Sequence, residues 1–254
     1  MLIPRRSFGD QDGISLVELM VALAAGAIVL SGVVQLFSNQ AASQAYSHHV
    51  IRLNQELRTL EEMMSRELRR AGFWGTTPDT SGFTIKNNPF WVSGYDLTIS
   101  NITGGTANSC ILFSYDLDQD GSLDTSSGND ERYGFRLATD GSGIGVVQMR
   151  RDSAGGTFSC GTAYGDTDWV DLTDPRNTHY TQVSFSLSEC KLKLTAASVS
   201  TTCPDTNTIN SGDPYLTKRQ VTITLTGQLV SDSTISMSST TEVWLRNDKL
   251  GVEP

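Results

Sequence analysis

The hydrophobic pattern of the N-terminal segment changes partway along and predicts one long helix with two different halves. Residues from Leu19 to Phe37 are almost all apolar, and this run is about as long as a membrane span. Beyond Phe37, apolar residues recur every three or four positions, as they do on one face of an amphipathic helix. This stripe consists of Tyr46, Val50, Leu53, Leu57, Leu60, Met64 and Leu68.

The predicted helix is uninterrupted because the chain has no proline from Ile14 to Ala71, and Gly72 is typical of a helix end. We predict a transmembrane or assembly half over residues 14–37 and an amphipathic half over residues 38–72. The stripe could enter a coiled coil, but it lasts only about three heptads and has Gln, Glu and Arg beside it. Packing against the chain's own domain is the favoured interpretation.

From Phe73 onward the pattern becomes typical of β-structure, with short apolar runs separated by Gly, Ser, Thr, Asn and Asp. The predicted strands are Cys110–Tyr115, Tyr133–Leu137, Gly145–Met149, Thr181–Leu187, Val221–Leu225 and Thr234–Leu245. The last two should form an antiparallel hairpin. The predicted fold class is therefore α+β, with the amphipathic half of the helix packed on one antiparallel sheet in a Ser/Thr-rich domain at residues 73–254.

Charge and composition exclude several functions. The chain has 19 Lys and Arg against 28 Asp and Glu, a formal net charge of -9, which argues against binding to nucleic acid. No catalytic signature surrounds His48, His49 or His179, so we expect a protein that is not an enzyme. The four cysteines predict disulfides in an oxidising compartment, and no C-x-x-C spacing supports the alternative of a zinc site. Pairing in sequence order, Cys110 with Cys160 and Cys190 with Cys203, is favoured.

An acidic loop predicts a calcium site. Acidic residues stand at loop positions 1, 3, 5 and 9, Gly121 stands at position 6, and the carbonyl of position 7 would also be a ligand. The predicted ligands are Asp116, Asp118, Asp120, Ser122 and Asp124. Position 12 is Ser127 rather than the Glu of an EF-hand, so Asp130 or Glu131 would have to complete the shell. The alternative is a solvated acidic turn, since Asp and Gly favour turns.

The apolar run begins beside one carboxylate. Glu18 is the only formal charge between Asp12 and Arg52, and a charge inside a membrane is costly enough to need compensation. Arg5 and Arg6 precede the run and would hold the N-terminus in the cytoplasm. A secretory signal peptide cleaved near Ala41-Ala42-Ser43 is the alternative, but the run is longer than the apolar region of such a signal.

The segment Gly13-Ile14-Ser15-Leu16-Val17-Glu18-Leu19 and the apolar helix after it resemble the class III signal of type IV pilins and type II secretion pseudopilins. This resemblance implies a pilin-like fold and a leader, residues 1–13, that a prepilin peptidase removes before methylating Ile14. Ile14 departs from the Phe that is commonest there. Glu18 would attract the N-terminal amine of a neighbouring subunit. The alternative is that Glu18 snorkels to the lipid headgroups.

The resemblance also implies a function. The size of the chain favours a PilW-like minor pilin, a non-catalytic subunit that primes pilus assembly and stays near the fibre tip. Its partners would be other minor pilins, the major pilin, the prepilin peptidase and the inner-membrane assembly platform. The chain would sit in the inner membrane of a Gram-negative bacterium, with a periplasmic domain, before it enters the fibre. A J-class pseudopilin of a type II secretion system and a membrane-anchored, calcium-stabilised binding domain remain alternatives.

Overall fold

The computed structural model describes residues 13, 15–75, 88–151, 156–194, 203 and 208–253. These residues form a long helix α1 (Leu16–Leu68), a short 3-10 helix η2 (Pro89–Trp91) and two antiparallel sheets. The chain separates into two compact units, Met1–His49 and Val50–Pro254, with α1 contributing to both. Each unit is described by itself.

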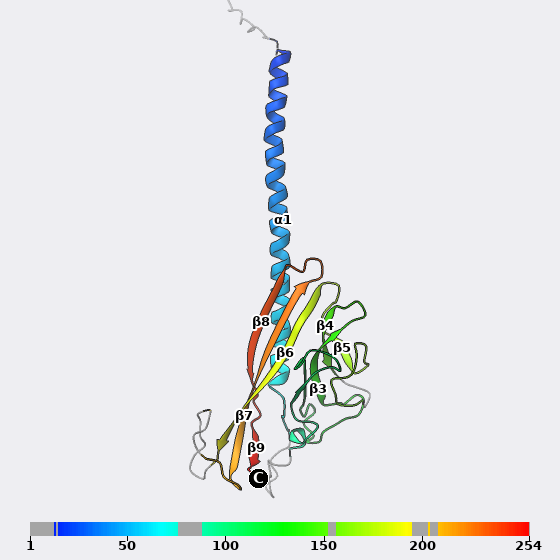
Figure 1. Cartoon of the computed structure of the whole chain (residues 1–254), viewed down its shortest axis with the longest axis vertical. Helices are drawn as coiled ribbons and strands as arrows, with labels where there is room; N and C mark the ends of the chain where they lie inside the picture. Colours follow the sequence, from blue (N-terminus) through cyan, green and yellow to red (C-terminus); the bar gives the residue numbers. More distant parts are fainter. Residues whose placement is uncertain are drawn as a thin grey trace, which may run out of the picture. The chain divides into compact units, whose positions relative to one another are not determined.

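The first unit contains the apolar part of α1, drawn in blue in Figure 1. Its large hydrophobic side chains are exposed within the chain, from Leu16 at 73% to Phe37 at 67%. The helix is long and apolar enough to cross a membrane. A surface of this kind is stable in lipid or against other apolar helices, so the unit has no need of a core of its own.

The second unit contains the last part of α1, whose apolar stripe is buried. Leu53, Met64 and Leu68 are fully buried, as the helical periodicity predicts. One member of the predicted stripe does not belong to it: Tyr46 lies in the first unit and is 57% exposed. The stripe packs against the chain's own strands rather than entering a coiled coil with another helix, which confirms the favoured interpretation.

The end of α1 is fixed by hydrogen bonds from other parts of the second unit. The helix ends at Leu68, and turns lead to Gly72, which has a φ of 73° in the left-handed region that favours glycine. The side-chain amide of Asn247 donates to the carbonyls of Arg70 and Ala71, both at 3.1 Å. Carbonyls that the helix itself cannot satisfy are thereby paired.

The strands form two sheets, where the sequence predicted one. In the first sheet the spatial order follows the chain; its strands are β1 (Thr98–Ser100), β2 (Cys110–Ser114), β3 (Arg132–Thr139), β4 (Gly145–Arg150) and β5 (Trp169–Asp171). The second sheet is built around β7, which pairs with the other three; its strands are β6 (Thr178–Lys193), β7 (Pro214–Leu229), β8 (Ser236–Trp244) and β9 (Lys249–Val252). The predicted hairpin is confirmed as β7 and β8.

The core lies between the helix stripe and one face of each sheet. It brings together Leu57 of α1, Phe113 and Phe135 of the first sheet, and Ile223 of the second. Strands β2, β3 and β4 are buried along nearly their whole length, which means that both of their faces are covered. On the face away from the main core, a smaller cluster contains Leu112 and Trp169.

Two disulfides hold segments of the second unit. Cys110 of β2 is bonded to Cys160, with both residues buried and their Cα atoms 6.1 Å apart. Cys190 of β6 is bonded to the exposed Cys203, with a Cα separation of 5.9 Å. These are the pairs that the sequence favours, and the structure has no free cysteine. The zinc alternative therefore has no thiolate to use.

Candidate functional site

The N-terminal segment holds the residues expected to be processed. Gly13 precedes the helix, and a Cβ atom added there would meet no other atom, so its backbone is accessible. Ile14 lies outside the described residues. Helix α1 starts at Leu16, and the amide of Leu19 donates to the carbonyl of Ser15 at 3.0 Å. Gly13 therefore lies before the first residue of α1.

Glu18 lies in the first turn of α1, where the free amide groups of a helix end favour a negative charge. Its side chain has no ion-pair partner in the described part of the chain. The helix macrodipole offsets typically about 0.3–1 kcal/mol, which is less than the cost of a charge at the centre of a membrane helix. Within the described residues, the helix macrodipole therefore offsets only part of that cost.

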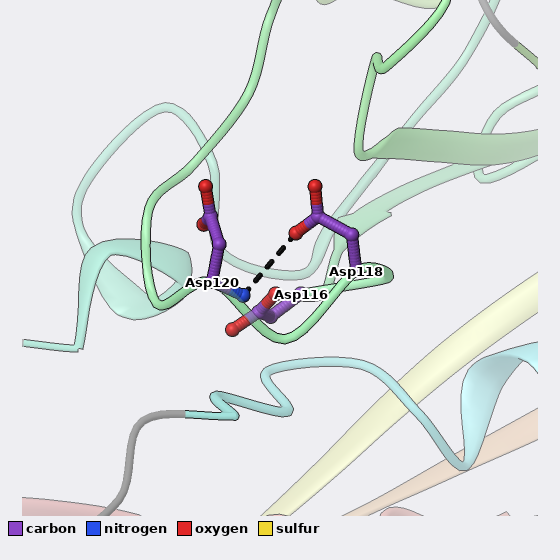
Figure 2. A group of neighbouring side chains, drawn as sticks. All are labelled: Asp116, Asp118 and Asp120. Atoms are coloured by element: carbon purple, nitrogen blue, oxygen red, sulfur yellow. Dashed lines mark hydrogen bonds between the residues drawn. The ribbon is translucent and has the colours of Figure 1, made fainter.

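The predicted metal loop connects β2 to β3. Asp116, Asp118 and Asp120 place one carboxylate oxygen each within 4.8 Å of one another, and Figure 2 shows the three side chains on one tight loop. Oxygens on opposite sides of a calcium ion lie roughly 4.6–5.2 Å apart, so this spread fits one ion. Asp118 and Asp120 are exposed, whereas Asp116 is buried.

Asp116 also shapes the loop. Its Oδ1 accepts from the amide of Gln119 at 2.7 Å, and its Oδ2 accepts from the amides of Gly75 and Gly121 at 2.8 and 3.0 Å. Gln119 and Gly121 both have positive φ values, 64° and 84°, which the tight turn requires. The buried carboxylate therefore orders the backbone that carries the two exposed ones.

Of the two residues expected to complete the shell, the structure brings only one to the loop. Glu131 accepts from the amides of Leu117 and Asp124, so its carboxylate closes the loop at its base. Burial, together with the nearby charges of Asp116 and Asp118, raises the pKa of Glu131 above its ordinary value, although the two backbone bonds oppose this.

Asp130 lies elsewhere. It is fully buried and forms ion pairs with Arg132 at 2.7 Å and Arg150 at 3.1 Å, which use its carboxylate for the core of the first sheet. The remaining predicted ligands are held within the same loop: the amide of Ser122 donates to the carboxylate of Asp120 at 2.7 Å, and the amide of Asp124 donates to Glu131. The group of three clustered carboxylates does not include Asp124.

Sequence reasoning missed a group of buried arginines on the outer face of the first sheet, formed by Arg132, Arg136 and Arg150. Arg136 donates to the carbonyls of Cys160 and Ala163 and to the carboxylate of Asp166, and its guanidinium lies 4.3 Å from the centre of the Trp169 ring. The only signal was the alternation of arginines with apolar residues in β3. This alternation does not identify a buried face, because nothing in the sequence shows that the loop containing Cys160 covers it.

The described residues contain no arrangement typical of nucleophilic catalysis. His179 accepts a hydrogen bond from the amide of Gly145 at 3.3 Å, and His48 and His49 are exposed on the first unit's helix. All four cysteines are in disulfides. The candidate site residues in the described ranges are therefore the ones that the sequence singled out, namely Gly13, Glu18 and the acidic loop.

Comparison with protein families gives two matches that together cover the N-terminal motif and most of the second unit. The model for the prokaryotic N-terminal methylation motif matches residues 9–34, which include Gly13, Ile14 and Glu18. The model for prepilin peptidase-dependent protein B matches residues 47–245. Neither the curated proteins nor the solved structures give a match. Since the second model covers more than half of the chain and the first covers the prepilin signal, the chain belongs to the prepilin peptidase-dependent protein B family of pilin-like proteins.

Proposed function

We propose that this pilin-like protein is a PilW-like minor pilin that helps to prime type IV pilus assembly and resides at or near the fibre tip. The observation that carries the proposal is the prepilin motif joined to a helix whose apolar half is wholly exposed and carries no charge after Glu18. Such a surface needs lipid before assembly and apolar helices of other subunits afterwards. The function is structural and requires no catalytic group.

The proposed mechanism begins with cleavage after Gly13. Cleavage frees an amine at Ile14, four residues before Glu18, and methylation retains its positive charge. The amine of one subunit then pairs with Glu18 of its neighbour, which offsets the cost of a carboxylate in an apolar environment. This pairing would set the register between helices, while the second unit selects the adjacent subunits.

N-terminal analysis tests the processing step. The mature protein, extracted from membranes, should begin at a methylated Ile14, and Gly13→Ala should leave the full-length precursor in the membrane. A mature chain that starts near Ser43 would instead indicate a secreted or membrane-anchored binding domain, and normal processing of Gly13→Ala would place the cleavage elsewhere.

Deletion of the gene tests the assembly role. A priming minor pilin should be needed for surface pili and twitching, and the defect should be restored by the intact gene. Loss of protein secretion with normal pili would favour the J-class pseudopilin, because the segment after Gly13 resembles the signal of both systems.

We also propose that the loop Asp116–Asp124 binds a calcium ion. The support is the spacing of three carboxylates within 4.8 Å and the preference of calcium for oxygen ligands in tight loops. Asp116, Asp118 and Asp120 would hold the ion, with the Ser122 carbonyl and Asp124 as further ligands. The ion would neutralise repulsion among the carboxylates and so stabilise the loop.

A further inference from the structure

A cleft in the second unit combines positive charge with an aromatic floor. It has a volume of about 390 Å³ and opens between the last turns of α1, the β2–β3 loop and the end of β4. A second, separate cavity of about 250 Å³ is also lined by Arg70, Tyr115 and Leu117, and by Asp116. The volume of the cleft accommodates several side chains of a bound segment.

Three guanidinium groups line the cleft, from Arg66, Arg70 and Arg151. The carboxylates that line it are Glu67 and Asp130, and Asp130 already forms ion pairs with the buried Arg132 and Arg150. Positive charge is therefore in excess here, although the whole chain has a net charge of -9. The sign of this local charge selects an anionic ligand.

The lining arginines retain donors for a ligand. Arg66 and Arg70 pair with Glu67 at 3.2 and 3.8 Å, but their side chains are 68% and 50% exposed, so these pairs hold them weakly. Arg151 is exposed, and its side chain forms no ion pair within the described ranges. A guanidinium has five N–H donors in a planar fork that matches a carboxylate.

The floor of the cleft is ordered by a buried carboxylate. The hydroxyl of Tyr115 donates to Glu67 at 2.9 Å, and the ring of Tyr115 stacks on that of Tyr133 with 4.3 Å between their centres. The guanidinium of Arg70 lies 5.5 Å from the centre of the Tyr115 ring. Met63 and Met149 add apolar surface. The site is thus preformed, with apolar surface between separate cationic groups.

We propose that this cleft binds an acidic segment of a neighbouring polypeptide, with carboxylates on Arg70 and Arg151 and an apolar side chain on the tyrosine pair. The arginines come from both sides of the floor, which suits a segment with spaced carboxylates better than one compact anion. That the neighbour is another pilin-like subunit rests on the proposed function. The preference for an acidic segment rests on the arginines and tyrosines of the cleft alone.

A defined peptide tests this site. The full-length chain in neutral detergent is titrated into a fluorescein-labelled peptide of alternating Glu and Phe, and binding is followed by fluorescence anisotropy. We expect saturable binding that weakens at least tenfold in Arg70→Ala/Arg151→Ala and in the matched peptide with Gln in place of Glu. Equal affinity of the double variant, or of the Gln peptide, would overturn the proposal.

Charge-matched controls separate the cleft from general attraction. Arg52→Ala/Arg246→Ala removes two exposed arginines that do not line the cleft and should bind within twofold of the unchanged chain. A tenfold loss in this control would contradict a specific site, as would displacement of the peptide by 1 mM inorganic phosphate. Arg151→Glu, at an exposed position, should also weaken binding tenfold without altering the melting temperature. Because binding is read on purified protein, failure here leaves the processing and assembly tests unaffected.

Discussion

At the scale of single residues, the structure contrasts charged groups that have several partners with Glu18, which has no ion-pair partner in the described residues. Arg136 is fully buried, yet its guanidinium is satisfied by carbonyls, by Gln148 and by Asp166. Glu18 has no such arrangement within the described chain. Removing one partner of a buried charge is strongly destabilising, because the remaining charge is left buried without compensation.

Asp166 provides a test of the buried arginine. Burial alone would raise the pKa of Asp166, but the hydrogen bond and charge of Arg136 outweigh this and lower it, with help from the amides of Thr162 and Ala163. A lowered pKa in the folded state stabilises it above the ordinary carboxyl pKa, and this contribution is lost as the pH falls through the lowered value. We expect Asp166→Asn to cost about 1.5–3 kcal/mol at pH 7, as for a hydrogen bond to a charged group.

The difference between the two proteins should shrink as the pH falls below about 4, because the unchanged chain then loses the same charge. Urea unfolding of the full-length protein at pH 7 and at pH 3 measures both values. Glu242→Gln, at an exposed position on β8, should change stability by less than about 0.5 kcal/mol. A cost for Asp166→Asn that is the same at both pH values would contradict the role assigned to its charge.

At the scale of elements, periodicity predicted the helix and the major strands. It did not show which elements pack against each face of a strand. The alternation of Ser and Thr with apolar residues in β6 and β7 correctly indicated one buried face. Strands β2 to β4 are covered on both faces. Charged residues are ordinarily assigned to exposed positions, so the sequence does not predict that the arginines on the outer face of these strands are buried. The division into two sheets depends on these long-range contacts, so it could not be predicted.

The acidic loop was predictable for a different reason. The spacing of Asp116, Asp118 and Asp120 is local, so residue types alone bring their carboxylates together. The sequence left open whether Asp130 or Glu131 faces the loop. Adjacent residues of an extended chain point to opposite sides, so only one of the two can do so, and the residue types do not show which. Glu131 turns to the loop and Asp130 to the buried arginines.

Calcium should stabilise the second unit through this loop. Adding calcium at about 100 times its dissociation constant to the purified full-length chain stabilises the native state by about 2.7 kcal/mol, if only that state binds. For a unit of this size the melting temperature should rise by roughly 5–10 °C. Asp118→Asn/Asp120→Asn should abolish the increase, while Asp140→Asn, in a turn away from the loop, should keep it. A melting temperature that does not change with calcium or with chelator would contradict calcium binding by this loop.

The two disulfides should differ in their effect on stability. Cys110–Cys160 spans 50 residues and lies beside Trp169 in a buried cluster, whereas Cys190–Cys203 spans 13 residues and is partly exposed. Cross-linking a longer segment restricts the unfolded chain more, by about 4 against about 3 kcal/mol in the chain-entropy model. Cys110→Ser/Cys160→Ser also places two hydroxyls in an apolar cluster, which adds a desolvation cost.

We therefore expect the variant of the first pair to lose at least about 1 kcal/mol more than Cys190→Ser/Cys203→Ser in urea unfolding. The fluorescence of Trp169 should change only in the first variant. Equal losses would show that Cys110–Cys160 does not hold the covering loop on the sheet.

At the scale of the whole molecule, the two units differ in where their apolar side chains lie. The second unit buries its helix stripe against its own sheets and satisfies the end of α1 with Asn247. The first unit leaves the apolar side chains between Leu19 and Phe37 exposed, and Glu18 is the one formal charge in its described helix. The second unit therefore has a hydrophobic core of its own, whereas the apolar side chains of the first unit need lipid or other apolar helices to cover them. Under the proposed mechanism, the amine that processing creates would be the charge partner of Glu18 in a neighbouring subunit.

Glu18→Gln tests that conclusion. Glutamine keeps the size and hydrogen-bonding capacity of the side chain but cannot attract an amine by charge, and it lowers the cost of inserting the helix. The variant should therefore be processed and inserted normally but be recovered at least tenfold less in sheared fibres, measured by quantitative immunoblotting against the membrane fraction. Glu62→Gln, an exposed position in the second unit, is the matched control and should assemble normally. Recovery of Glu18→Gln at the control level would show that shape and apolar contact, without the ion pair, are enough to bring the subunit into the fibre.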